Sequence, residues 1–200
     1  MEKCRLVFVG LLAALALTAP AEAFLPYRMM LEAAKSPEKP MELVQDKRLR
    51  TQLREALLVA DPDGVLSISP YVFLGHAFLV GWVDSPAERM KLVDAARGVG
   101  GLRSLDVYLP EKPANVSTSA DEELKLKVEE AITLESSAQR MNVSIQVLAG
   151  HVVLLGAVRS GEEIQSADAA ARAVPGVTGI TSYLLVPAPG QEKMLEGLLP

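Results

Sequence analysis

One short stretch of this 200-residue chain occurs twice. GHAFLVGWVDSPAE at residues 75–88 returns as GHVVLLGAVRSGEE at residues 150–163, with both glycines, the histidine and the final glutamate kept. Shifting the sequence by 75 positions, without a gap, pairs similar residue types throughout residues 46–108. Self-similarity at a fixed spacing predicts two copies of one structural unit. The clearest pairs are Asp46 with Asp121, Leu49 with Leu124, Ala56 with Ala131, Gly75 with Gly150, His76 with His151, Gly81 with Gly156, Ser85 with Ser160, Glu88 with Glu163, Gly101 with Gly176, and Tyr108 with Tyr183.

The repeat also sets the expected domain organisation. A segment containing Pro, Ser and Thr, EKPANVSTSA, separates the two copies and is typical of a linker. The predicted segments are a signal peptide at 1–23, an N-terminal extension or linker at 24–45, the first unit at 46–110, a linker at 111–120, the second unit at 121–187, and a C-terminal tail at 188–200.

Local patterns predict the order α-β-β-α-β in each unit. Residues 47–60 place apolar side chains at helical spacing, and DPDG at 61–64 ends that helix. Alternation over 65–72 and 77–83 predicts a hairpin of two strands. A capping box, Ser85 with Glu88 in the first copy, opens a second helix, and a last strand follows. We therefore expect an α+β fold in which each unit is a three-stranded sheet with two helices on one face.

The N-terminus has the features of a secretory signal peptide. MEKCR supplies cations, LVFVGLLAALALTA supplies an apolar run, and AEA at 21–23 supplies small residues at a cleavage site. The apolar run of about 14 residues is shorter than the ~20 needed to cross a bilayer core, so a retained anchor is the weaker interpretation. The only cysteine, Cys4, precedes the run, which differs from a lipoprotein and leaves the exported chain without a thiol.

The hairpin GHVVLLGAV and the segment AARAVPGVTGI at 170–180, in this order of elements, resemble the BON domain. With a signal peptide ahead of two copies, the chain is similar to dual-BON periplasmic and outer-membrane-associated proteins of Gram-negative bacteria, including osmotically inducible ones. The resemblance implies a non-enzymatic protein of the periplasm that binds phospholipid surfaces and supports the cell envelope.

Glycines account for part of the repeated stretch. Gly75 and Gly150 are expected to supply a positive φ or a tight turn. Gly81 and Gly156 are expected to mark a close approach of the second helix to the strand, and Gly176 to end that helix.

The sequence nominates no reactive centre. His76 and His151 occupy equivalent turn positions without Cys or clustered carboxylates nearby, so we interpret them as turn residues and predict no metal site. DPDG lacks the downstream ligands of a calcium loop. No triad context or phosphate-binding glycine loop is present, so we predict no enzyme activity and no cofactor; a hydrolase is the weakest alternative. With aromatic residues at 4%, a base-stacking surface for nucleic acid is not expected either.

Charge distinguishes the two units. The first unit has eight Lys/Arg and eight Asp/Glu, whereas the second has five against nine, a net charge of −4. Since anionic headgroups attract basic segments, the first unit is the expected contact with an acidic bilayer. The predicted lipid-binding residues are Arg48, Arg50 and Arg54 on the opening helix or Arg89, Lys91 and Arg97 on the second helix, with Trp82 as an interfacial aromatic residue.

Two alternatives remain open. The same arginines can be an ordinary solvated helix face. The partner can be an envelope protein instead of lipid, with the chain acting as an adaptor through strand edges or the acidic face of the second unit.

Overall fold

The computed structural model describes residues 39–134 and 142–188, and the predicted signal peptide, most of the N-terminal extension and nearly all of the tail lie outside them. The described elements confirm the α+β class and the order α-β-β-α-β in both copies. In the first repeat they are α2 (Lys39–Ala60), the 3-10 helix η2 (Gly64–Ser67), β1 (Ile68–Phe73), β2 (His76–Gly81), α3 (Pro86–Arg97) and β3 (Ser104–Tyr108). In the second they are α4 (Thr118–Leu134), β4 (Asn142–Leu148), β5 (His151–Ala157), α5 (Gly161–Ala173) and β6 (Gly179–Leu185).

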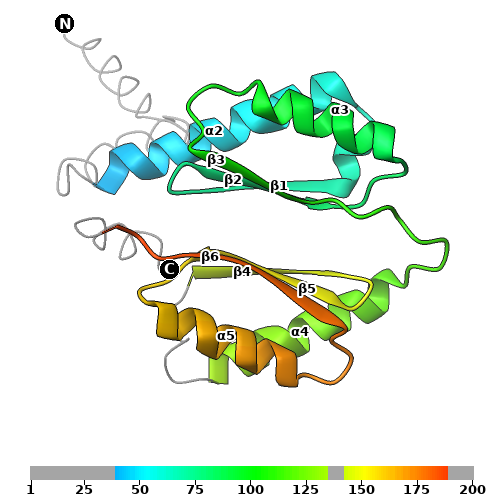
Figure 1. The fold of residues 1–200 in the computed structure, drawn as a ribbon, viewed down its shortest axis with the longest axis vertical. Helices are drawn as coiled ribbons and strands as arrows, with labels where there is room; N and C mark the ends of the chain where they lie inside the picture. The colour runs from blue at the N-terminus through cyan, green and yellow to red at the C-terminus, as the bar shows by residue number, and fades with distance from the viewer. Residues whose placement is uncertain (1–38, 135–141, 189–200) are drawn as a thin grey trace, which may run out of the picture. The chain divides into compact units, whose positions relative to one another are not determined.

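Each repeat contains one three-stranded sheet with its two helices on one face (Figure 1). In the first sheet β2 is central, antiparallel to β1 and parallel to β3; in the second, β5 is central in the same way. The first strand begins later than the alternation predicts, because residues 64–67 form a 3-10 turn that leads into β1. Helix α2 begins at Lys39, eight residues before the predicted start at 47.

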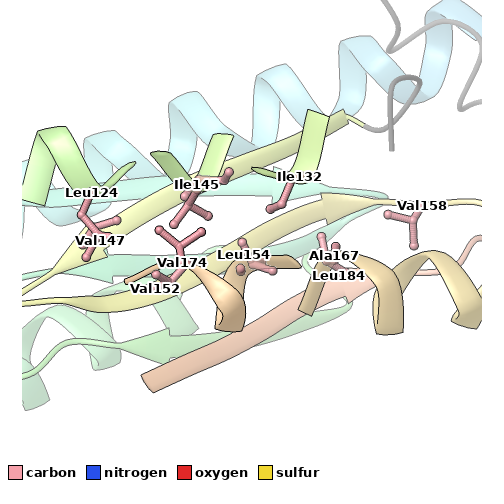
Figure 2. Packing of buried hydrophobic residues seen from close by; sticks show 12 residues of the cluster. Leu124, Ile132, Ile145, Val147, Val152, Leu154, Val158, Ala167, Val174 and Leu184 are labelled. Carbon is pink, nitrogen blue, oxygen red and sulfur yellow. The ribbon is translucent and has the colours of Figure 1, made fainter. Parts of the chain in front are cut away.

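A separate apolar core lies between the helices and the sheet of each repeat. In the second repeat, side chains from α4, α5 and all three strands point into this core (Figure 2). Leu49, Leu53 and Leu57 on α2 are the buried stripe that the periodicity of the sequence predicts. Burial of these stripes is the main favourable term that holds the helices on the sheets.

An aspartate that recurs at the same position of both repeats holds the hairpin turn. In the first repeat, the two Asp46 carboxylate oxygens accept hydrogen bonds from the N–H groups of Leu74 and Gly75, each at 2.8 Å. Asp121 binds the equivalent amides of Ala149 and Gly150 at 2.8 and 2.9 Å. Both residues of each turn have positive φ, from 51° to 79°, as in a type I′ hairpin turn. This aspartate clamp therefore fixes a turn in which both residues have positive φ, a conformation that only the glycine adopts readily.

Gly81 lies at a close approach, as predicted, but the prediction that the second helix causes it is wrong. A Cβ at Gly81 would collide with the carbonyl oxygen of Ser67 and lie 2.9 Å from Cα of Ile68, so the crowding comes from β1 and the turn before it, not from the helix α3. Its equivalent Gly156 has φ +143°, and Gly176, after α5, has φ +101°. These positions require glycine because of backbone geometry within the sheet and the turns.

The serine half of both capping boxes forms as the sequence predicts, whereas each glutamate bonds the residue before the N-cap serine. The Ser85 hydroxyl accepts a hydrogen bond from the Glu88 N–H at 3.2 Å, and Glu88 reaches back to the N–H of Asp84 at 2.6 Å. In the second repeat Ser160 and Glu163 do the same, with Glu163 accepting from the N–H of Arg159 at 2.7 Å. Each box satisfies amides that would otherwise lack a partner at the start of the helix.

The repeats differ at a position of the second helix and a position of the last strand that border the core in the first repeat. Val93 and Val107 pack against the core of the first repeat, whereas Asp168 and Ser182 stand at the equivalent positions of the second. Within the described residues, Oδ1 of Asp168 and Oγ of Ser182 are buried without a hydrogen-bond partner. Leaving a buried polar atom unsatisfied costs about 1–3 kcal/mol, so this site lowers the stability of the second repeat.

We predict that Asp46→Asn lowers the free energy of unfolding by about 2 kcal/mol. The amide keeps one acceptor but turns an N–H donor toward the second turn amide, which is itself a donor. Urea unfolding followed by circular dichroism measures the change. Asp63→Asn is the control, because Asp63 is exposed and makes no side-chain capping bond; equal losses in the two variants would contradict the clamp.

We further predict that Asp168→Val combined with Ser182→Val, which installs the residues of the first repeat, raises the free energy of unfolding by at least about 2 kcal/mol. Differential scanning calorimetry compares it with wild type and with the exposed control Glu162→Val, for which a change within about 0.5 kcal/mol is expected. An unchanged or lower transition temperature in the double variant would show that the polar pair is not a source of instability.

Candidate functional site

The arginines predicted on the opening helix are exposed on α2, but the helix does not bring all three together. At ~100° per residue, Arg50 and Arg54 lie about 40° apart, whereas Arg48 lies roughly 160° from Arg50 around the axis. Lys47 falls beside Arg54, and the exposed Leu58 follows one turn later. Lys47, Arg50, Arg54 and Leu58 thus form one exposed line, which we call the basic stripe.

The predicted cations of α3 do not extend the basic stripe. The Lys91 ammonium pairs with Asp61 at 3.2 Å, and the Arg97 guanidinium pairs with Asp94 at 3.4 Å. Arg89 is exposed, roughly 160° from Lys91 around the helix axis. The backbone N–H of Gly64 and then the Lys91 ammonium hold the pKa of Asp61 below its usual value, so this carboxylate serves the turn after α2. The arginines of α2 make no ion pair among the described residues, and the stripe is the better candidate for an external anion.

The second repeat lacks this surface. At the 75-residue offset, Lys47, Arg50 and Arg54 correspond to Glu122, Lys125 and Glu129 on α4. Two of three positions have reversed charge on a helix of the same fold. The charge difference between the units is therefore concentrated at the equivalent of the basic stripe.

Trp82 lies apart from the basic stripe. It is half-buried and packs against a cluster on the sheet face opposite to the helices. Side chains alternate along a strand, so Leu79 enters the helix-covered core while Phe78, Val80 and Trp82 point to the other face. We call this whole apolar cluster, with its aromatic and aliphatic members, the inter-repeat cluster. It includes every aromatic side chain in the described residues: Tyr71, Phe73, Phe78, Trp82, Tyr108 and Tyr183.

The inter-repeat cluster joins the two sheets, and both repeats belong to one compact unit. The rings of Phe78 and Tyr183 lie 5.4 Å apart, and the Tyr183 hydroxyl donates to the carbonyl oxygen of Val107 at 3.4 Å. The Gln146 side-chain amide hydrogen-bonds the hydroxyl of Tyr71, its own equivalent in the other repeat. Contact between equivalent positions is the mark of a two-fold arrangement, so the duplication has built a covalently linked pseudo-dimer.

The two halves of this contact have unequal side chains. The first repeat supplies Phe73, Phe78 and Trp82, where the second has Leu148, Val153 and Ala157. Phe78 and Val153 are both almost completely buried. At these three positions the first repeat therefore supplies the larger side chains and the second supplies smaller ones.

The two histidines begin β2 and β5, the central strands of the two sheets. Nδ1 of His76 lies 2.8 Å from the Ser104 hydroxyl of its own sheet. The His151 ring stacks on Tyr108 of the other repeat, with centroids 4.7 Å apart, and its Nε2 lies 2.9 Å from the Thr181 hydroxyl. Within the described residues no group of three or more His, Cys, Asp or Glu is placed to hold a metal ion. Among those residues there is also no helix with the length and apolar character of a membrane span.

The fold is a tandem pair of small α+β domains, each with the order α-β-β-α-β, whose sheets contact each other. Both units match the BON domain, at residues 45–109 and 120–188, which together make up well over half of the chain. The chain therefore belongs to the BON domain family.

The similar proteins found share little sequence identity with this chain. A protein of Anaplasma centrale, described as an uncharacterized protein in the gshII 5′ region, is 25% identical over 121 residues, which are 59% of this chain and 80% of that protein. Two structures of CdsD, a structural protein of the Type III secretion system of Chlamydia trachomatis, are 13% and 15% identical. They cover 72% and 78% of this chain and 67% and 70% of theirs, with TM-scores of 0.30 and 0.31, too low for any property of CdsD to be carried over.

We predict that Phe78→Ala lowers the free energy of unfolding by about 3–5 kcal/mol, since it opens a cavity between the sheets. It also shifts the native emission of Trp82 to longer wavelength, because water reaches the inter-repeat cluster. Leu79→Ala is the control: it faces the other core, costs about 2–5 kcal/mol and leaves the Trp82 emission unchanged. Identical emission shifts in the two variants would contradict separate faces.

Proposed function

We propose that this chain is a non-enzymatic, exported protein of the cell envelope whose first repeat binds anionic phospholipid surfaces through the basic stripe on α2. Membership in the BON family supports an envelope-associated role. The N-terminal MEKCR, its apolar run and AEA support export to the periplasm.

The observation that carries the lipid proposal is the line of Lys47, Arg50 and Arg54. All three side chains are exposed, and they make no ion pair among the described residues. A basic residue near an anionic membrane contributes about 1 kcal/mol, so the stripe supplies about 3 kcal/mol of attraction. Leu58 at its end is exposed and apolar, which suits the headgroup region of a bilayer.

The second repeat has the opposite role in this proposal. Glu122 and Glu129 occupy the positions of Lys47 and Arg54, and the repeat as a whole carries net charge −4. Such a surface is repelled by anionic lipid. Bound through α2, the chain holds its second repeat away from the membrane surface.

We predict that Arg50→Glu with Arg54→Glu weakens binding to vesicles of anionic phospholipid by at least roughly 30-fold, because two attractions of about 1 kcal/mol each are lost. Flotation of the mature protein with vesicles of phosphatidylglycerol mixed with neutral lipid measures the change, at several salt concentrations.

The matched control carries the same charge change elsewhere. Arg48→Glu with Arg89→Glu alters two exposed arginines outside the basic stripe and is expected to retain most binding. If both double variants lose binding equally, attraction depends only on net charge and the stripe is not a site. If wild-type protein does not float with anionic vesicles, the lipid proposal fails.

A second candidate function is that of an adaptor that binds an envelope protein without lipid contact. The edges of the two sheets favour it unequally. β1 contains Pro70 and β3 contains Asp106, both of which discourage strand addition, whereas the edge strands β4 and β6 have neither proline nor charge. An extended segment of a partner can pair with such an edge. Capture of a defined envelope protein by a chain that does not float with vesicles would favour this function.

A further inference from the structure

Both histidines of the chain begin a central strand, and His151 contacts the other repeat. His76 shares its strand face with Phe78, and His151 shares its face with Val153, both members of the inter-repeat cluster. Histidine is the side chain whose charge ordinarily changes between pH 5 and 8. Both histidines therefore lie on the sheet faces that carry the inter-repeat cluster, and one of them is part of the contact.

His151 is the histidine held by the other repeat. Its ring lies nearly parallel to Tyr108 of β3, at an interplanar angle of 14°, and its Nε2 meets the Thr181 hydroxyl. On the remaining side it lies against Gly179, where a Cβ would come within 2.6 Å of Nδ1. Burial in this setting lowers the pKa of His151, because the imidazolium loses hydration when the sheets close.

The charged and titratable groups around His151 do not compensate for that burial. Asp106, on the facing strand β3, contributes after burial to a raised pKa of Tyr183. Asp121 on α4 is engaged by the amides of Ala149 and Gly150 next to His151. Tyr108 is neutral at these pH values, and burial raises its pKa further. Among the described residues, burial is the only cause of the shift at His151.

His76 is held differently. Its Nδ1 meets the Ser104 hydroxyl, which lies 3.5 Å from a carboxylate oxygen of Asp106. At the equivalents of Ser104 and Asp106 the second repeat has Gly179 and Thr181, which leaves His151 without a nearby acid of its own sheet. Duplicate histidines with different partners provide an internal control.

We propose that the contact between the two sheets is an acid-sensitive joint, in which protonation of His151 favours separation of the repeats. The closed form holds the neutral ring against Tyr108, whereas the open form returns it to water, where it takes up a proton at about pH 6.5. Because His151 has a lower pKa in the closed form than in the open form, the closed form is most stable above the ordinary pKa of histidine. It loses stability relative to the open form as the pH falls below that value. The ratio of open to closed forms therefore rises by up to tenfold per unit below about pH 6.5, until the pH reaches the pKa of the closed form.

The single tryptophan of the sequence reports on this joint, because Trp82 packs in the inter-repeat cluster. Emission of the mature protein is recorded from pH 7.5 to 5.0, with far-ultraviolet circular dichroism at each step. We expect a red shift of Trp82 emission with falling pH while the helix signal is retained, the same shift in His76→Gln, and a flat profile in His151→Gln.

A second measurement tests the proposal without relying on Trp82 fluorescence. Proton NMR follows the Cε1–H of His151 in wild type and in Tyr108→Leu, and loss of the stacked ring is expected to raise the titration midpoint toward 6.5. The proposal is overturned if His151→Gln shows the wild-type emission change, if the wild type shows none, if helix signal is lost in step with emission, or if the midpoint does not move in Tyr108→Leu.

Discussion

A three-stranded sheet with apolar side chains on both faces must have both faces shielded from water, but the helices of each repeat cover only one face. In the first repeat Leu79 faces the helices while Phe78 faces away, yet both are almost fully buried. The second face is covered by the sheet of the other repeat. Because a unit of about 65 residues buries only a modest share of its surface, the contact between the sheets adds to the burial that stabilises both repeats.

Some features are the same in both repeats, and others differ between them. Parts that set the backbone are kept in both copies: the aspartate that binds the hairpin amides, the glycine that follows, and the serine and glutamate that open the second helix. Parts that face outward have diverged. The positions of Lys47, Arg50 and Arg54 are mostly acidic on α4, and the first repeat supplies more of the aromatic side chains of the inter-repeat cluster than the second. The copies thus share a fold and differ in the surfaces available for partners.

Much of the fold was predictable because it depends on short-range patterns. The apolar stripe of α2, the capping boxes and the order of elements all follow from spacing within a few residues. The joint between the sheets was not predicted, since it requires residues about 75 positions apart to meet. A signal was present: Phe78 and Leu79 are adjacent and both apolar, as in strands buried on two faces. The grouping of Arg48 with Arg50 and Arg54 treated nearness in sequence as nearness on a helix, which the 3.6-residue period does not permit.

Leu74 connects turn geometry with the history of the chain during synthesis. Its φ of 55° is unfavourable for a side chain with a Cβ, and its side chain is buried in contact with Ala157 of the second repeat. The ribosome completes the first repeat long before it makes β5. Until then, Asp46 holds the turn, but the Leu74 side chain and the aromatic sheet face of the first repeat lack the cover that the second repeat provides. Transiently exposed apolar surface favours aggregation, so completion of the second repeat removes a surface on which the half-made chain could associate.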